Sequence, residues 1–369
     1  MKKMTRLLTI AAAVAMLALP IAAKTVIAGP GTLGQDQCTP ENKEAYYAAF
    51  RESRTTDQAK AYDQAKKYLA CPPGEASETQ TKIIDYLKKW VGAYEDATKK
   101  MRLPQLIYND KKYPEAYALG REIVAAEPDN LKALIDLGAN GYLLANLKNP
   151  QLSNEAVGYA RKAIEMLDAG KTVESWAPLS GKEEALAYLN YTIGSLTLDQ
   201  DPSGALKHLI KAAQIETPLK KSPYTYSYIA VAYESGLYAK QSDEYKRLYT
   251  GKDETPESKL ALANINQLID RMIDGYARAV ALAGTDARFQ SGKTVWNEQL
   301  TNWYKYRHNQ SDAGLSEMVA SILSKPLPPE PTPLTSLPAA APAGTAAGTP
   351  TTTSSTTPAN AAKPGGAKP

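Results

Sequence analysis

Apolar residues recur along most of this chain at the three- and four-residue spacing that places side chains on one face of an α-helix. The clearest case is the stretch from Leu260 to Ala281, where this apolar face contains Leu268, Ile269, Met272, Ile273, Tyr276 and Val280. Gly284 is a residue type that commonly ends a helix, so we expect a stop there. Two further helices are predicted, from Thr294 to His308 and from Ala313 to Leu323.

The predicted helix starts carry recognisable capping residues. Thr39 and Thr255 each precede a proline, which is the order of N-cap and first helical residue. Ser77 and Gln80 have the spacing of a capping box. The composition agrees, because 23 tyrosines against 2 phenylalanines, with few β-branched runs, suit packed helices better than a sheet. The sequence therefore predicts an all-α fold.

Small and bulky residues also repeat at matching positions in five predicted helix pairs. In one pair the second helix contains Ala116, Gly120, Ile123 and Pro128, and the next first helix contains Leu134, Leu137, Gly138 and Tyr142. Similar spacings occur near residues 45–73, 156–163, 189–212 and 226–246. This pattern resembles the tetratricopeptide repeat, in which small residues let two helices approach and large ones fill the groove between them. Tyr142 stands one place later than the family's aromatic residue, with Gly141 in the usual position.

The resemblance implies an α-solenoid of helix-turn-helix repeats. It covers about residues 42–256 of a helical domain at 41–323, and residues 257–323 supply extra helices. In this family the first helix of each repeat lines a concave binding face, which implies a partner groove formed by Gln105, Tyr108, Ile135, Tyr142, Asn190, Tyr224 and Glu234. Amides and aromatic rings of this kind suit an extended peptide. The alternative is that the tyrosines pack between neighbouring repeats.

The N-terminus predicts export. Three basic residues precede an apolar run from Leu7 to Leu19, and small residues follow, as in a secretory signal peptide. We expect residues 1–23 to be removed, with cleavage as late as residue 28 as the alternative, leaving a linker at 24–40. The apolar run is too short for a confident membrane span, so no transmembrane anchor is expected after signal removal. The predicted location is the periplasm or the extracellular space.

Cys38 and Cys71 are the only cysteines, and an even number in an exported chain predicts a disulfide. At the other end, residues 324–369 hold 11 of the 25 prolines and almost no bulky apolar residues. Such a segment buries too little surface to offset its ordering entropy, so a disordered tail is predicted.

The chain shows no recognisable catalytic motif. Its two histidines, His208 and His308, lie far apart in sequence, and no phosphate-binding loop, nucleophile motif or zinc motif is present, so we expect no enzyme activity and no cofactor. The 43 basic residues are interleaved with 39 acidic ones, and three of the basic residues lie in the leader, so nucleic acid is not an expected partner.

Three functional hypotheses follow. The first is an exported scaffold that binds another envelope or secreted protein or peptide. The second is a module that binds carbohydrate or another small ligand, suggested by the aromatic content. The third is a hydrolase built from unrecognised carboxylates, which requires a deep acidic pocket.

Overall fold

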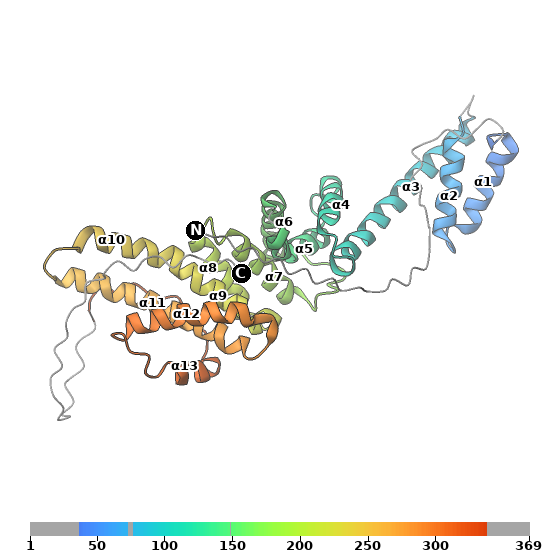
Figure 1. Cartoon of the computed structure of the whole chain (residues 1–369). Coiled ribbons are helices and arrows are strands. Elements are labelled where there is room, and N and C mark those ends of the chain that lie inside the picture. The colour runs from blue at the N-terminus through green and yellow to red at the C-terminus, as the bar shows by residue number, and fades with distance from the viewer. Residues whose placement is uncertain (1–36, 73–76, 148, 338–369) are drawn as a thin grey trace, which may run out of the picture. The chain divides into compact units, whose positions relative to one another are not determined.

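The computed structural model describes residues 37–72, 77–147 and 149–337. Throughout these residues the secondary structure is helical, without a β-strand, which confirms the predicted all-α fold class (Figure 1). The described residues form two compact units, the first ending at Glu95 and the second beginning at Asp96. The predicted signal peptide, most of the predicted linker and the chain beyond residue 337 lie outside the described residues.

The first unit is built from α1 (Pro40–Ser53), α2 (Gln58–Ala70) and the first part of α3 (Glu78–Pro104). Its core contains Phe50, Leu87 and the small residues Ala61 and Ala65, all completely buried. Because alanine side chains are short, α1 and α2 approach closely along this face. The ring of Phe50 meets that of Trp90 edge-on, with centroids 5.0 Å apart.

The predicted disulfide joins the two ends of this helix pair. Cys38 and Cys71 are bonded, with their Cα atoms 5.3 Å apart. Cys38 precedes the α1 N-cap Thr39, whose hydroxyl accepts a hydrogen bond from the backbone of Asn42. Cys71 is the residue that ends α2. The bond therefore fixes the start of α1 beside the end of α2.

The predicted capping box at the start of α3 is also present. The Gln80 backbone donates to Ser77 Oγ, and the Ser77 backbone donates to Gln80 Oε1, at 3.3 and 3.0 Å. At the start of α11, Thr255 forms the same reciprocal arrangement with Ser258. These side chains satisfy backbone N–H groups that have no partner within the helix.

The second unit contains a series of helices that pack on their neighbours in the sequence. The segment η2 (Gln105–Asn109) continues α3. The elements that follow are, in chain order, α4 (Tyr113–Ala126), α5 (Leu131–Ala139), η3 (Gly141–Leu147), α6 (Pro150–Asp168), α7 (Lys182–Thr197), α8 (Pro202–Gln214), η4 (Pro218–Lys221), α9 (Pro223–Ala232), η5 (Tyr233–Tyr238), α10 (Ala239–Tyr249), α11 (Pro256–Ala283), η6 (Ala287–Phe289), α12 (Gln290–Arg307), α13 (Leu315–Ser321) and η7 (Ile322–Ser324). Helix α5 packs against both α6 and α7, α7 against α8, and α8 against α9. Helix α11 then packs against α9 on one side and α12 on another.

The predicted fifth helix pair differs from its expected form. Residues 223–249 make one uninterrupted helical run, α9–η5–α10, and α11 packs against all three segments. No turn separates the two predicted helices, because this stretch has no proline after its first residue, Pro223, and its one glycine, Gly236, lies within the π-helical segment η5. A Cβ at Gly236 would lie 3.1 Å from Ser203 Oγ, so this residue permits a close approach to α8.

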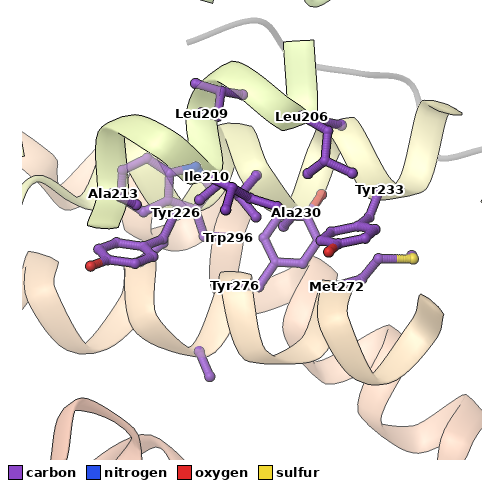
Figure 2. Packing of buried hydrophobic residues seen from close by; sticks show 14 of the residues in the cluster. Leu206, Leu209, Ile210, Ala213, Tyr226, Ala230, Tyr233, Met272, Tyr276 and Trp296 are labelled. Atoms are coloured by element: carbon purple, nitrogen blue, oxygen red, sulfur yellow. The ribbon is translucent and has the colours of Figure 1, made fainter. Parts of the chain in front are cut away.

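The largest core of the second unit lies between α8, α9, α11 and α12. Figure 2 shows side chains from these helices and from η5 meeting in this layer: Leu206, Leu209, Ile210, Ala213, Tyr226, Ala230, Tyr233, Met272, Tyr276 and Trp296. The α11 residues Met272, Ile273 and Tyr276 are among those predicted to form its apolar face, and each is at most 3% exposed. The predicted face is therefore the buried one.

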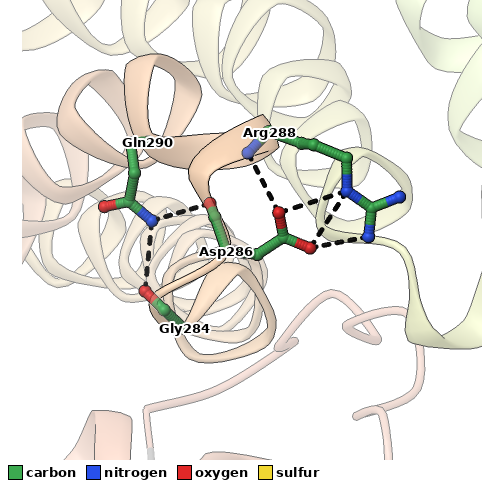
Figure 3. Close-up of polar contacts among 4 residues, drawn as sticks. All are labelled: Gly284, Asp286, Arg288 and Gln290. Atoms are coloured by element: carbon green, nitrogen blue, oxygen red, sulfur yellow. Dashed lines mark hydrogen bonds and ion pairs between the residues drawn. The ribbon is translucent and has the colours of Figure 1, made fainter.

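The turn from α11 to α12 is held by polar contacts (Figure 3). Gly284, at a positive φ of 48°, ends α11 as predicted. Asp286 accepts hydrogen bonds from both the backbone and the guanidinium of Arg288, and the Gln290 side chain donates to the Gly284 and Asp286 carbonyls. These contacts satisfy backbone groups between the two helices.

Residues 325–337 form a strap along α11. The carbonyl oxygens of Pro326, Pro329 and Leu334 accept hydrogen bonds from Arg278, Arg271 and Asn264, respectively. Asn264 also accepts from the Leu334 backbone at 2.7 Å. The predicted disordered tail began at residue 324, so the ordered chain extends further than expected. The composition of this segment did not predict the strap, because proline carbonyls can accept hydrogen bonds from the side chains of a neighbouring helix even where the segment has no apolar run.

Gly138 is required by the contact between α5 and α6. A Cβ at this position would lie 2.8 Å from Ala160 Cα and 2.9 Å from Ala160 N, which are backbone atoms of α6. We expect Gly138→Ala to lower the free energy of unfolding by about 2 kcal/mol, because overpacking outweighs the gain in helix propensity. Gly158→Ala on α6, where nothing lies within 4 Å, should instead raise it by about 0.5–1 kcal/mol. Urea denaturation measures both changes in the free energy of unfolding. Equal changes in the two variants would contradict the requirement for glycine at position 138.

None of the helices in the described ranges is long and apolar enough to cross a membrane.

Candidate functional site

The seven residues predicted to line a groove do not form one surface. Ile135 is 1% exposed and belongs to the core between α5, α6 and α7. Asn190 is also buried, where its amide donates to the Leu186 carbonyl and its Oδ1 lies 2.8 Å from His208 Nδ1. The structure corrects these two predictions, because Ile135 of α5 and Asn190 of α7 lie on helix faces that pack into the core.

The other five residues are at least partly accessible but are divided among different places. Gln105 is exposed on η2. Glu234 lies in η5, where it accepts a hydrogen bond of 2.8 Å from the Tyr276 hydroxyl. Tyr108, Tyr142 and Tyr224 are half-buried. Of these, Tyr108 and Tyr142 line one pocket, and Tyr142 and Tyr224 are linked by further tyrosines.

This chain of rings is defined here as the tyrosine row, and it comprises Tyr188, Tyr142, Tyr191, Tyr228 and Tyr224. Successive ring centroids in the row lie 6.0, 5.3, 6.1 and 6.3 Å apart. Tyr191 is buried, whereas the other four rings are partly exposed. The row thus offers aromatic surface contributed by η3, α7 and α9.

Helical periodicity places these rings side by side. Tyr188 and Tyr191 are three residues apart on α7, and Tyr224 and Tyr228 are four apart on α9, so each pair shares a helix face. At the α9 end, Tyr224 meets Trp296 of α12 and Phe289 of η6 edge-on, at 5.4 and 5.7 Å. Such edge-on contacts fix ring orientation.

Tyr142 reaches the row because of an irregular helix end. Helix α5 ends at Ala139, and Tyr142 lies in the 3₁₀-helix η3 that follows. The Tyr142 backbone N–H donates to Thr192 Oγ1 at 3.2 Å. A Cβ at Gly141 would lie 2.6 Å from Thr192 Cγ2, so a glycine is needed for this approach.

The hydroxyls of Tyr142 and Tyr188 remain protonated at neutral pH. Burial, followed by the nearby Tyr188 and Tyr113, raises the pKa of Tyr142 to about 12. Burial likewise raises the pKa of Tyr188, with a further contribution from the Glu184 carboxylate. Both groups are therefore hydrogen-bond donors and acceptors rather than anions.

An open pocket of about 140 Å³ lies at the Tyr188 end of the row. The rings of Tyr108, Tyr142 and Tyr188 line it, together with Ala139, Asn140, Leu179 and Glu184. Tyr108 is oriented by its hydroxyl, which donates to Asp136 Oδ1 at 3.0 Å. The pocket therefore combines three aromatic walls, an amide and a carboxylate.

Two carboxylates lie in this region, and they differ in environment. Asp136 is 1% exposed, and burial raises its pKa, although the Lys132 ammonium 2.5 Å away acts in the opposite direction. Glu184 is partly exposed and accepts a 2.6 Å hydrogen bond from the Ser180 backbone. Within the described part of the chain, Asp136 has an ion-pair partner and Glu184 has none.

The histidines occupy structural positions. Burial, helped by Lys211 and Arg161, lowers the pKa of His208, so the ring bonded to Asn190 is neutral. His308 ends α12 and stacks on Tyr304, with ring centroids 4.1 Å apart. Among the residues that the structure describes, no group of three His, Cys, Asp or Glu side chains could hold a metal ion.

Three residues of the row, Tyr188, Tyr191 and Tyr228, were not among the predicted groove residues, although their spacing from one another and from Tyr224 contains the signal. Glu184 was not predicted either. A count of tyrosines at three- and four-residue spacing on first helices could have identified the row.

The chain matches no family model, and no curated protein or solved structure is found to be similar to it.

Proposed function

We propose that this chain is an exported scaffold with a tetratricopeptide-like solenoid, which binds an extended segment of another envelope or secreted protein along the tyrosine row. The observation that carries the proposal is the row itself, in which four partly exposed rings and the buried Tyr191 between them form a continuous series of ring contacts from η3, α7 and α9. Tyrosine is enriched at binding surfaces because it combines apolar area with a polar group at little entropic cost.

Two structural features support the solenoid part of the proposal. Consecutive helices pack on their neighbours from α4 to α9, and the small residues of the repeat pattern lie at the contacts. Gly138 of α5 faces Ala160 of α6, and Gly120 of α4 faces Leu137 of α5. A solenoid places its first helices along one extended face, which is where proteins of this architecture bind partners.

The disulfide supports the export part. Cys38 and Cys71 are oxidised, and such bonds persist in the periplasm or outside the cell. The leader-like sequence at residues 1–23 is the second support.

The binding surface is tested by replacing Tyr224 with a photo-crosslinking phenylalanine analogue in the full chain. We expect a specific crosslinked protein, and we expect Tyr228→Ser to reduce that crosslink at least fivefold, since removal of a contact ring costs about 1 kcal/mol or more. The same analogue at Tyr86, an exposed tyrosine outside the row, is the control. The purified partner should then bind the purified chain with the same sensitivity to Tyr228→Ser.

Equal crosslinking from positions 224 and 86 would remove the row as the binding surface. Crosslinks only to glycans, with oligosaccharide binding lost in Tyr228→Ser, would replace the peptide ligand with a carbohydrate.

A further inference from the structure

The pocket at the Tyr188 end of the row has a composition that selects for positive charge. Its walls include the rings of Tyr108, Tyr142 and Tyr188, whose faces carry negative potential. The Glu184 carboxylate lies on the same lining. An anion is repelled by both features, whereas a cation is attracted by both.

The two carboxylates near the pocket, Asp136 and Glu184, differ in whether a positive charge compensates them. Asp136, behind Tyr108, is paired with Lys132 at 2.5 Å and is almost completely buried. Glu184 receives a single backbone hydrogen bond, from Ser180, and no ion pair from the described residues. Its carboxylate is therefore the group that can pair with a cation entering from solvent.

The size of the pocket limits the ligand. A volume of about 140 Å³ admits several water molecules, and so the end of a long side chain, but not a folded element. Leu179 and Ala139 supply apolar surface for the methylene stem of such a side chain. The pocket continues into the tyrosine row through Tyr142 and Tyr188, which belong to both.

We propose that this pocket binds the ammonium or guanidinium end of a lysine or arginine side chain in the bound partner segment, with Glu184 as counter-charge and Tyr108, Tyr142 and Tyr188 as the aromatic walls. This inference rests on the proposed function, since it assigns one side chain of the segment that the row binds. It adds a charge requirement to a surface that is otherwise aromatic.

Weak model ligands test the pocket without knowledge of the partner. N-acetyl-lysine amide and N-acetyl-arginine amide are titrated into the full chain, and N-acetyl-norleucine amide, which lacks the charge, is titrated in parallel. Affinity is measured from chemical-shift changes. We expect the two cations to bind about tenfold more tightly than norleucine amide, with the difference shrinking at high salt.

Glu184→Gln is the decisive variant. Glutamine keeps an oxygen that can accept the Ser180 hydrogen bond, so the start of α7 should be retained. We expect cation affinity to fall five- to tenfold and norleucine affinity to stay unchanged. Glu174→Gln, which removes the same charge at an exposed site outside the pocket lining, should leave all three affinities unchanged.

Equal binding of all three amides, an unchanged cation affinity in Glu184→Gln, or no binding at all would each overturn the cation pocket. If the amide titrations give such a result but a partner still crosslinks to position 224, the proposed function is retained and only the cation pocket is lost. Absence of a specific crosslink from position 224 in the chain that carries only the photo-crosslinking analogue would remove the proposed function independently of the pocket.

Discussion

Replacement of Asp274 with alanine is expected to lower the free energy of unfolding by about 3–5 kcal/mol. Asp274 Oδ1 accepts a hydrogen bond of 2.7 Å from Arg278 Nε, and the Arg278 side chain is only 5% exposed. Without the carboxylate, Arg278 keeps its hydrogen bond to Pro326 and its position over the Tyr226 ring but has no counter-charge. A buried and uncompensated guanidinium is costly, and urea denaturation measures the loss.

Asp270→Ala is the matched control on the same helix, one turn away. Asp270 pairs with Arg307 at 2.9 Å, but the two side chains are 44% and 35% exposed, so we expect a loss of about 1 kcal/mol or less. The double variant Asp274→Leu and Arg278→Met, which removes both charges, should recover most of the stability lost in Asp274→Ala. Equal losses in the Asp274 and Asp270 single variants would contradict the role of burial.

Removal of the disulfide in the variant Cys38→Ser and Cys71→Ser is expected to destabilise the first unit by about 3–4 kcal/mol. The two cysteines are 33 residues apart, so the bond restricts a long loop in the unfolded chain. Hydrogen exchange followed by mass spectrometry should show faster exchange in Pro40–Ser53 and Gln58–Ala70.

The exchange of α11 in the second unit should not change, and this serves as an internal control. A reductant should have the same effect on the unaltered chain and no effect on the double serine variant. Unchanged exchange in α1 and α2 would mean that the first unit does not depend on the bond.

The helices were predictable because their signals are local. Leu268, Met272 and Tyr276 share a face at helical spacing, and the structure buries this face in α11, which runs from Pro256 to Ala283. The Thr255 cap and the Gly284 stop fix its ends through contacts with residues close in sequence.

The candidate site was predictable only in part. Tyr108, Tyr142 and Tyr224 were predicted to face a partner, and the structure leaves them half-buried. Ile135 and Asn190 were predicted with them but lie inside the core. A repeat pattern specifies which helix carries a residue, whereas small rotations of each helix decide which residues reach the surface.

The sequence by itself determined the helical fold class, the principal caps and the pairing of Cys38 with Cys71, because periodicity, capping and the presence of only two cysteines depend on residues that can be read along the chain. Only the tertiary structure decided that the chain from 223 to 249 is one helical run, that residues 325–337 lie along α11, and that rings from η3, α7 and α9 form a row beside Glu184. These features depend on contacts between segments distant in sequence, whose energies no local pattern encodes.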